Sequence, residues 1–209
     1  MKPDPTTFDH PPASPGPLFG AWLDYARTKT EAPNWNAMAL ATATDDGAPS
    51  VRMVLLKEWD LDAMAITFYT NYESRKASEL DANPRLAVVL HWDDLERQLR
   101  VRGVAERADD ETSDRYFASR DRLSQLGAWA SAQSHEVEKR EELEQRLREF
   151  EERHPPGEPV PRPPHWGGYV ITALEVEFWL GKPGRLHERL RYDRDTPDRE
   201  EWRRRFLQP

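Results

Sequence analysis

Strand-forming residues fill two neighbouring runs, RLAVVLHW at residues 85–92 and QLRVRGVAER at residues 98–107. Turn sequences such as Asn83-Pro84 punctuate these runs, and no regular alternation of strand and helix is visible, so the pattern predicts an antiparallel sheet rather than βαβ units. Several runs are apolar at successive positions, as in strands covered on both faces, which favours a barrel over a flat sheet. The other runs are AMALATAT at 37–44, SVRMVLLK at 50–57, AMAITFYT at 63–70, GGYVITAL at 167–174, VEFWL at 176–180 and RLHERLRY at 185–192.

Four helices are predicted around this sheet. Apolar residues between Leu18 and Ala26 recur on one helical face, and Ser74 is a plausible N-cap for a helix that ends at Asn83-Pro84. Asp109 or Asp110 can cap a third helix that continues through Phe117. Residues 136–152 carry a few apolar side chains on a charged background, which predicts an amphipathic helix with a solvated face.

Length and composition predict one folded domain. The chain has 209 residues, of which 37% are hydrophobic, 33% charged and 10% aromatic, so the aromatic residues supply a core although the apolar fraction is low. Residues 1–17 hold six of the 18 prolines and no periodic apolar pattern. We therefore expect a flexible proline-rich N-terminal arm at 1–17 and a single domain at 18–209.

Several classes of function are excluded or disfavoured. The chain has no cysteine, which rules out disulfides and cysteine-based metal sites, and its six histidines show no paired ligand spacing, so no metal site is predicted. A net charge of -8 argues against nucleic acid as a partner. No apolar run approaches the ~18 residues of a membrane span, and no signal peptide is visible, so we expect a cytoplasmic protein without membrane contact.

One basic cluster lies at the predicted start of the second helix. Arg75 and Lys76 follow Ser74 in the first turn, where cations oppose the helix dipole, while Arg52 and Lys57 bracket an apolar strand. A bound anion would resolve this conflict, because a helix N-terminus offers free backbone N–H groups. The alternative is a solvated helix end.

A second cluster consists of Tyr116, Arg120 and Ser124, which recur at intervals of four and could lie along one side of a helix as phosphate ligands. The alternative is an ordinary amphipathic helix. Two phosphate sites would suit a phosphorylated cofactor and a phosphorylated substrate. Arg185 and His187 alternate with Arg189 on one face of a predicted strand, which favours an anionic or aromatic ligand there.

Seven motifs occur in the order found in one known family, and together they resemble the pyridoxine (pyridoxamine) 5'-phosphate oxidases. The resemblance implies an α+β fold that is mainly β, an antiparallel Greek-key split β-barrel with flanking helices, which binds FMN between the two subunits of a homodimer. The motifs are RMVLLK at 52–57, FYTNYESRK at 68–76, LERQ at 95–98, YFASR at 116–120, SQLGAWASAQS at 124–134, RPPHWGGY at 162–169 and EFWLGKPGRLHERLRY at 177–192.

The resemblance also implies the reaction and the residues that serve it. Pyridoxine 5'-phosphate or pyridoxamine 5'-phosphate would be oxidised at C4' to pyridoxal 5'-phosphate, with O2 as the final acceptor. The implied FMN contacts are Arg52, Met53, Val54, Leu55, Leu56, Lys57, Tyr69, Thr70, Arg75, Lys76, Gln98, Gln133, Ser134, Trp179 and Arg189. The implied substrate contacts are Lys57, Tyr116, Arg120, Ser124, Arg185 and His187, of which Arg185 and His187 are the implied catalytic residues.

Two other functions are weighed against this one. A related split-barrel flavin oxidase of the phenazine type would act on a bulkier aromatic metabolite, and a noncatalytic member would only bind flavin or pyridoxal phosphate. The family arm that covers the substrate usually carries arginine and tyrosine, and residues 1–17 contain neither. Tyr116, Arg120 and Ser124 are all present, which favours the phosphorylated B6 substrate.

Overall fold

The computed structural model describes residues 7–209, so the first six residues of the arm expected at 1–17 lie outside the described residues. The elements between α1 and β6 are α1 (Gly16–Lys29), β1 (Ala37–Ala43), β2 (Pro49–Leu55), β3 (Glu58–Asp60), β4 (Ala65–Asn71), α2 (Arg75–Ala82), β5 (Arg85–Trp92), the 3-10 turn η1 (Asp93–Leu95) and β6 (Arg97–Arg107). The remaining elements are α3 (Asp110–Ser119), α4 (Arg122–Ala130), α5 (Arg140–Arg153), β7 (Trp166–Leu180), the 3-10 turn η2 (Pro183–Arg185), β8 (Glu188–Asp193) and β9 (Arg203–Leu207).

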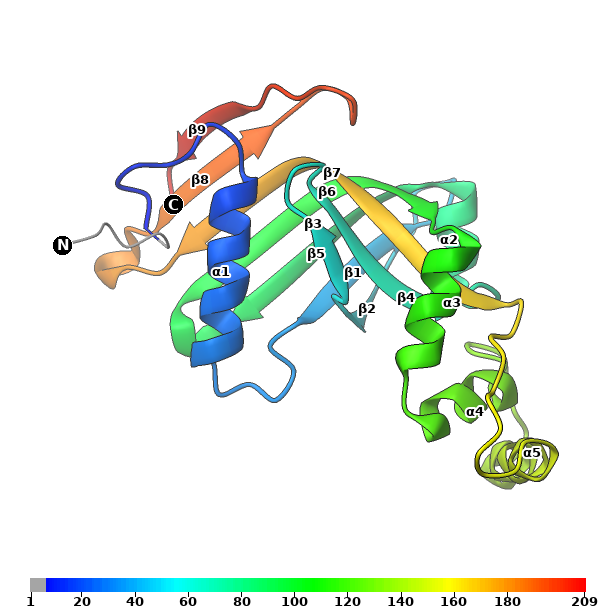
Figure 1. Ribbon diagram of the computed structural model, residues 1–209. Helices are drawn as coiled ribbons and strands as arrows, with labels where there is room; N and C mark the ends of the chain where they lie inside the picture. The colour runs from blue at the N-terminus through cyan, green and yellow to red at the C-terminus, as the bar shows by residue number, and fades with distance from the viewer. Residues whose placement is uncertain (1–6) are drawn as a thin grey trace.

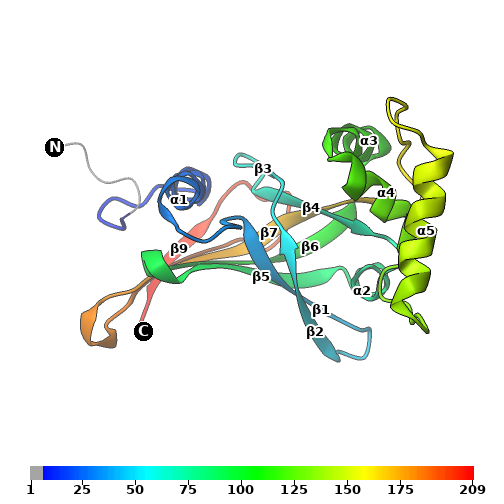
Figure 2. The same cartoon turned by 90° about the horizontal axis from the view of Figure 1, so that it is seen from below.

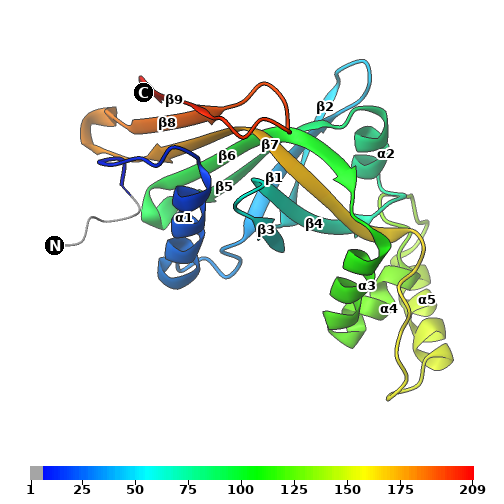
Figure 3. The ribbon, with the colours of Figure 1, turned by 45° about the horizontal axis from the view of Figure 1, so that its top comes forward.

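The strands of residues 7–209 form one antiparallel sheet in the order β2-β1-β5-β6-β7-β4-β3, which confirms the predicted antiparallel fold. Strand β7 pairs with β6 along one edge. On its other edge, its first half pairs with β4 and its second half with β8, which in turn pairs with β9. The sheet therefore divides at β7, and Figure 3 shows β8 and β9 leaving at the end opposite helices α2 to α5.

The strand positions follow the runs seen in the sequence. β1, β5 and β6 occupy the predicted runs with small shifts at their ends, and β5 alternates between buried and more exposed positions, as a strand over a core should. The runs at 167–174 and 176–180 form the single strand β7, because the polar residue between them stays within the ladder to β6.

Two helix predictions need correction. The helix expected at 136–152 begins at Arg140, so Val137 precedes it. The chain also forms α4, which the sequence analysis did not separate from α3: Asp121 caps it by accepting a hydrogen bond from the Ser124 N–H at 2.9 Å.

The main core lies between the sheet and α1, which crosses one sheet face in Figures 1 and 2. Trp22 of α1 is fully buried and meets Phe178 of β7 edge to face, with ring centroids 5.3 Å apart. Phe8, in the proline-rich segment, stacks on the same indole at 6.0 Å, and Tyr192 donates a hydrogen bond to the carbonyl of Pro12. The described part of this segment is thus packed against α1 and β8.

A second, smaller apolar cluster lies under helices α3 to α5 at the other end of the sheet. It contains Phe117, Leu126, Val160 and Trp166, all of them buried. This cluster holds the helical subdomain against the start of β7, and it forms the support for the site described below.

Within residues 7–209, no helix is both long enough and apolar enough to span a bilayer.

We predict opposite effects for two glycine substitutions. Gly103 lies at an irregularity in the β6–β7 ladder, and a Cβ atom there would lie 2.2 Å from the Thr172 carbonyl oxygen. Gly103→Ala should therefore lower the free energy of unfolding by about 1–3 kcal/mol. Gly127 lies within α4 with open space around it, so Gly127→Ala should raise that free energy by roughly 0.5–1 kcal/mol. Urea unfolding measures both, and a Gly103→Ala protein as stable as the wild type would contradict this packing.

Candidate functional site

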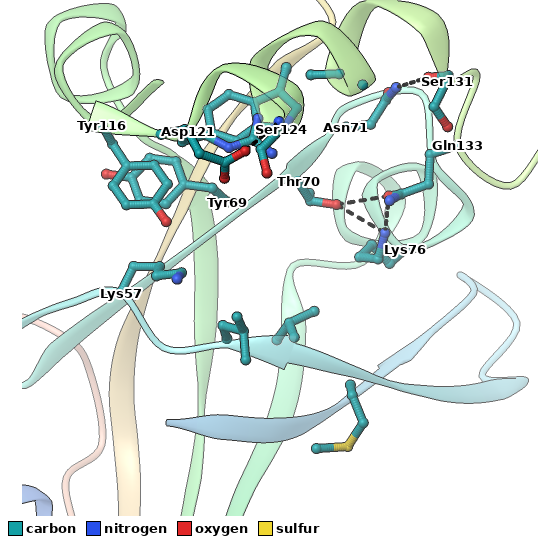
Figure 4. A pocket seen from close by; sticks show the side chains of 17 residues that line it. Lys57, Tyr69, Thr70, Asn71, Lys76, Tyr116, Asp121, Ser124, Ser131 and Gln133 are labelled. Carbon is teal, nitrogen blue, oxygen red and sulfur yellow. Dashed lines mark hydrogen bonds between the residues drawn. The ribbon is translucent and has the colours of Figure 1, made fainter. Parts of the chain in front are cut away.

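A pocket of about 700 Å³ opens between strands β2 and β4 and helices α2, α3 and α4. Figure 4 shows polar and aromatic side chains from these elements converging on it. The lining residues are Met53, Val54, Leu55, Lys57, Tyr69, Thr70, Asn71, Lys76, Tyr116, Arg120, Asp121, Ser124, Gly127, Ala128, Ser131, Gln133 and Trp166.

At one side of the pocket a buried ammonium group is held by neutral oxygens. Lys76 Nζ donates to Thr70 Oγ1 at 2.9 Å, to Ser74 Oγ at 2.9 Å and to Gln133 Oε1 at 2.6 Å. Burial, aided by the positive charge of Arg52, lowers the pKa of Lys76 to about 8. Among residues 7–209 no carboxylate forms an ion pair with this ammonium, so an anion bound beside it would be stabilised.

The opposite wall of the pocket is aromatic. Tyr69 stacks on Tyr116 with ring centroids 3.9 Å apart, and both rings are nearly parallel to Trp166. The Tyr69 hydroxyl donates to Glu58 at 3.0 Å, and Lys57 Nζ lies 5.8 Å from the centre of the Tyr116 ring. Figure 4 shows the two tyrosines stacked near Lys57, away from Lys76. The wall is flat, with a cation beside it.

Arg120 adds a second poorly compensated cation on the aromatic side. Its guanidinium lies 4.6 Å from the centre of the Trp166 ring, and its buried Nη1 has no hydrogen-bond partner among the described residues. Burial lowers the pKa of Arg120, although the group stays charged. A buried donor without an acceptor costs free energy, so this end of the pocket also favours an anionic ligand.

The helix that was expected to align Tyr116, Arg120 and Ser124 does not exist. Tyr116 belongs to α3, Arg120 is the extended residue that follows it, and Ser124 lies in the first turn of α4. The break at Arg120 turns the chain, and all three side chains still line the same pocket. The prediction that one helical face carries all three residues is therefore wrong, although all three line one pocket.

The structure divides the remaining FMN contacts implied by the resemblance. Arg52 and Arg75 both bind the buried carboxylate of Glu79, and Arg75 directly precedes Lys76 in the chain. Leu56 is buried in the main core, and Ser134 follows Gln133 with a φ of 73°. The residues that line the pocket directly are Met53, Val54, Leu55, Lys57, Tyr69, Thr70, Lys76 and Gln133.

The other implied ligands form a separate group around the end of β7. Trp179 faces Gln98 on β6 and Arg189 on β8 in the strand register, and its ring lies 4.5 Å from the His187 ring, centre to centre. Arg189 pairs with Glu177 at 2.8 Å. Figures 1 and 2 both show the turn before β8 at the opposite end of the sheet from α2 and α4. Within one chain, this group does not meet the pocket.

Arg185 and His187 are not on a strand, which corrects the alternation expected from their spacing. Arg185 ends the 3-10 turn η2 with a φ of 61°, and β8 begins only at Glu188. The His187 ring accepts a hydrogen bond from the Lys182 N–H at 3.2 Å. The two residues thus belong to an exposed turn, which Gly184 makes possible with a φ of 69°.

Sequence reasoning missed some of the pocket residues. Asn71, Asp121 and Ser131 line the pocket, and Asn71 donates a hydrogen bond to the Ser131 carbonyl that closes one side. Trp166 was within a recognised motif, but no sequence signal placed its ring beside Arg120. Asp121, a good N-cap residue two positions before Leu123, was the available sign that a new helix begins there.

Among residues 7–209, no group of three or more His, Cys, Asp or Glu side chains is arranged to hold a metal ion.

The fold and pocket define a split-barrel protein with a cationic, aromatic-walled site. Comparison with protein families agrees: the profile of the family described as "Pyridoxamine 5'-phosphate oxidase" matches residues 27–154. A second profile, "Pyridoxine 5'-phosphate oxidase C-terminal dimerisation region", matches residues 166–209. The chain belongs to the pyridoxamine 5'-phosphate oxidase family and is therefore an oxidoreductase, as the sequence motifs predicted.

Relatives of known name cover almost the whole chain. The pyridoxine/pyridoxamine 5'-phosphate oxidase of Rubrobacter xylanophilus is 54% identical over 94% of this chain and 88% of its own length. The protein of the same name from Salinibacter ruber is 50% identical over 90% of this chain and 86% of its own length.

Solved structures share the fold. The crystal structure of PhzG from Burkholderia lata 383, in complex with tetrahydrophenazine-1-carboxylic acid, is 33% identical and covers 100% of this chain and 98% of its own, with a TM-score of 0.87. A pyridoxamine 5'-phosphate oxidase-related, FMN binding protein from Nostoc punctiforme is 18% identical, covers 91% of this chain and 95% of its own, and has a TM-score of 0.71. The second similarity supports the split-barrel fold alone.

The burial of Lys76 predicts a pH signature in the flavin-free protein. Its pKa is about 8 when folded, against 10.5 as the ordinary value, so between these pH values the unfolded chain binds more protons than the folded one. The contribution of Lys76 to the free energy of unfolding should therefore rise with pH across this window. Compared with a Lys76→Met variant, the wild type should gain stability as pH rises in urea unfolding, whereas parallel pH curves would show that this ammonium is not buried.

Proposed function

We propose that this protein is an FMN-dependent oxidase that converts pyridoxine 5'-phosphate and pyridoxamine 5'-phosphate to pyridoxal 5'-phosphate. The observation that carries the proposal is a pair of cations in one pocket, the buried Lys76 on one side and the half-buried Arg120 on the other, neither of them ion-paired among the described residues. Two phosphorylated molecules, a cofactor and a substrate, would neutralise both. The names of the relatives from Rubrobacter and Salinibacter support the same reaction.

The residues present fit FMN. Lys76, Ser74 and Gln133 form a polar cradle at the start of α2, and Met53, Val54 and Leu55 of β2 also line the pocket. The cradle would hold the phosphate of the cofactor, because it combines the Lys76 ammonium with a helix N-terminus, where backbone N–H groups are free to bind an anion. When bound, FMN would accept the hydride removed from C4', which carries two electrons, and O2 would then take these two electrons to give hydrogen peroxide.

The aromatic side of the pocket fits the substrate. Arg120, Ser124 and Lys57 would bind its phosphate, and the parallel rings of Tyr69 and Tyr116 give a flat surface that excludes water. The phosphate grip orients the pyridine ring, so that C4' is presented to the cofactor side of the pocket. This chain thus supplies charge and orientation, while the cofactor supplies the redox chemistry.

We further propose that the site is completed by a second copy of the chain in a homodimer. Trp179, Arg185, His187 and Arg189 lie at the far end of the sheet from the pocket of the same chain. A two-fold symmetric pair can bring the far end of one copy to the pocket of the other, giving two equal sites. The match of residues 166–209 to a family dimerisation region supports this assembly.

The proposed reaction is tested by anaerobic mixing. The purified protein should be yellow, and either substrate should bleach the flavin absorbance in a single turnover, with colour returning on admission of O2. Flavin absorbance that neither substrate bleaches would instead indicate a noncatalytic flavin-binding member of the family.

A second candidate is an oxidase of a phenazine precursor, favoured by the 33% identity to PhzG over the whole chain. Its ligand in that structure is a carboxylic acid without phosphate, whereas this pocket carries Arg120, Ser124 and Lys57 together. Tetrahydrophenazine-1-carboxylic acid is the discriminating reductant: bleaching by it, with no bleaching by the two B6 phosphates, would replace the proposed function by this one.

We predict that Arg120→Met separates substrate binding from cofactor binding. Loss of a charge-assisted hydrogen bond is worth about 1.5–3 kcal/mol, so the substrate dissociation constant should rise about 10-fold to 100-fold. The flavin content should stay near the wild-type level, because the Lys76 side of the pocket is untouched. The dependence of the flavin reduction rate on substrate concentration measures substrate affinity, and flavin absorbance measures flavin content. Loss of flavin with unchanged substrate affinity would show that the Arg120 side binds the cofactor.

A further inference from the structure

Glu79 is a buried carboxylate that lies behind the proposed phosphate cradle. It is on α2, one helical turn after Arg75, and only 4% of its surface is exposed. Arg75 Nε donates to it at 2.8 Å and Arg52 Nη2 at 3.2 Å, and the hydroxyls of Thr42 and Ser50 donate as well. Burial alone would raise its pKa, but these four donors outweigh burial and lower the pKa to about 2. The group is therefore a fixed negative charge.

The two guanidinium groups bound to Glu79 differ in burial and in the number of their other partners. Arg52 is largely buried and is also bound to Thr42, Ser50 and the Leu40 carbonyl, so its position is fixed. Arg75 uses only Nε in the hydrogen bonds of the described residues, and its side chain is 66% exposed. Its two terminal nitrogens are thus available to a ligand at the start of α2.

The charges around this carboxylate do not balance within the chain. Arg52 and Arg75 share Glu79, and Lys76 follows Arg75 in the first turn of α2, so three positive charges accompany the one negative charge of Glu79. The sum is near +2, which a phosphate monoester with a charge of about -1.5 to -2 would neutralise. Without the carboxylate, Arg75 would lose its hydrogen-bond acceptor, and repulsion from Arg52 would turn it away from the site.

We propose that Glu79 is a positioning residue of the flavin phosphate site, which holds the guanidinium groups of Arg52 and Arg75 beside Lys76 and so makes the site selective for the phosphorylated flavin. The inference rests on the proposed binding of FMN. In this proposal the Glu79 carboxylate contributes to the recognition of an anion. It acts through the two arginines and does not touch the ligand. Only the phosphate end of the ligand should depend on it.

The test compares FMN with riboflavin, which has the same ring system and lacks the phosphate. Full-length protein stripped of flavin is titrated with each, and quenching of flavin fluorescence gives the dissociation constants. Glu79→Gln keeps the size of the side chain and removes its charge. We expect FMN affinity to fall about 10-fold to 100-fold, as for loss of charge-assisted hydrogen bonds, while riboflavin affinity stays within about 2-fold of the wild type.

The matched control is Asp81→Asn on the same helix. Asp81 also binds an arginine and a hydroxyl, those of Arg107 and Tyr169, but neither lies at the pocket. This variant should keep the wild-type preference for FMN. If Glu79→Gln does not fold, Thr42→Val combined with Ser50→Ala removes two of the four donors to the carboxylate and should reduce the preference in the same direction.

Each outcome decides between roles. Unchanged FMN affinity would overturn the proposal, and tighter FMN binding would show that Glu79 only reduces the positive charge of the site. Equal loss of both flavins would show a purely structural role. A wild-type protein that binds neither flavin would instead contradict the proposed function, which keeps the two failures distinguishable.

Discussion

The hydrogen-bonded ladder of β7 is the constraint on which the site depends. This strand runs from Trp166 to Leu180, and it pairs with β6 from Tyr169 onward and, on its other edge, first with β4 and then with β8. Trp166 forms part of the pocket wall, and Trp179 belongs to the group of implied ligands at the far end. At about 3.3 Å per residue, an extended strand separates these two side chains by roughly 40 Å, and the paired neighbours keep it from folding back. The two halves of the proposed site would therefore have to come from different copies of the chain.

Electrostatics would make the pocket selective for phosphorylated ligands. Burying a cation is costly unless it is paired, and the pocket buries Lys76 among neutral oxygens and Arg120 against an aromatic ring. Holding these cations without a paired anion costs free energy, and bound phosphates would remove that cost. Glu79 offsets part of this cost for Arg52 and Arg75, which lie behind the Lys76 side of the pocket. A net charge of -8 keeps this attraction local rather than a property of the whole surface.

The sequence predicted the fold well and the site only in part. Strands and helices could be predicted because burial of one face gives apolar residues a period of two in strands and of 3.6 in helices. The ordered motifs identified the family. The residue types at the pocket were also visible in the sequence, but their arrangement was not. Tyr116, Arg120 and Ser124 are spaced by four residues whether one helix continues through them or, as here, a break follows Ser119. Arg185 alternates with His187 in the sequence even though the turn at Gly184 keeps Arg185 out of β8. Glu79 gave no signal, since a glutamate on a helix is ordinarily solvated.

The shared site is tested most directly by mixing two inactive variants. In a dimer with Arg120→Ala in one copy and Arg185→Ala in the other, a site shared between copies leaves one of the two pockets with both arginines. Co-expressed copies with different tags allow this mixed dimer to be isolated. The account predicts that it oxidises pyridoxamine 5'-phosphate at about half the wild-type rate, while each variant homodimer is impaired. A mixed dimer no more active than the two homodimers would contradict the account, because each pocket would then depend on residues of its own chain alone.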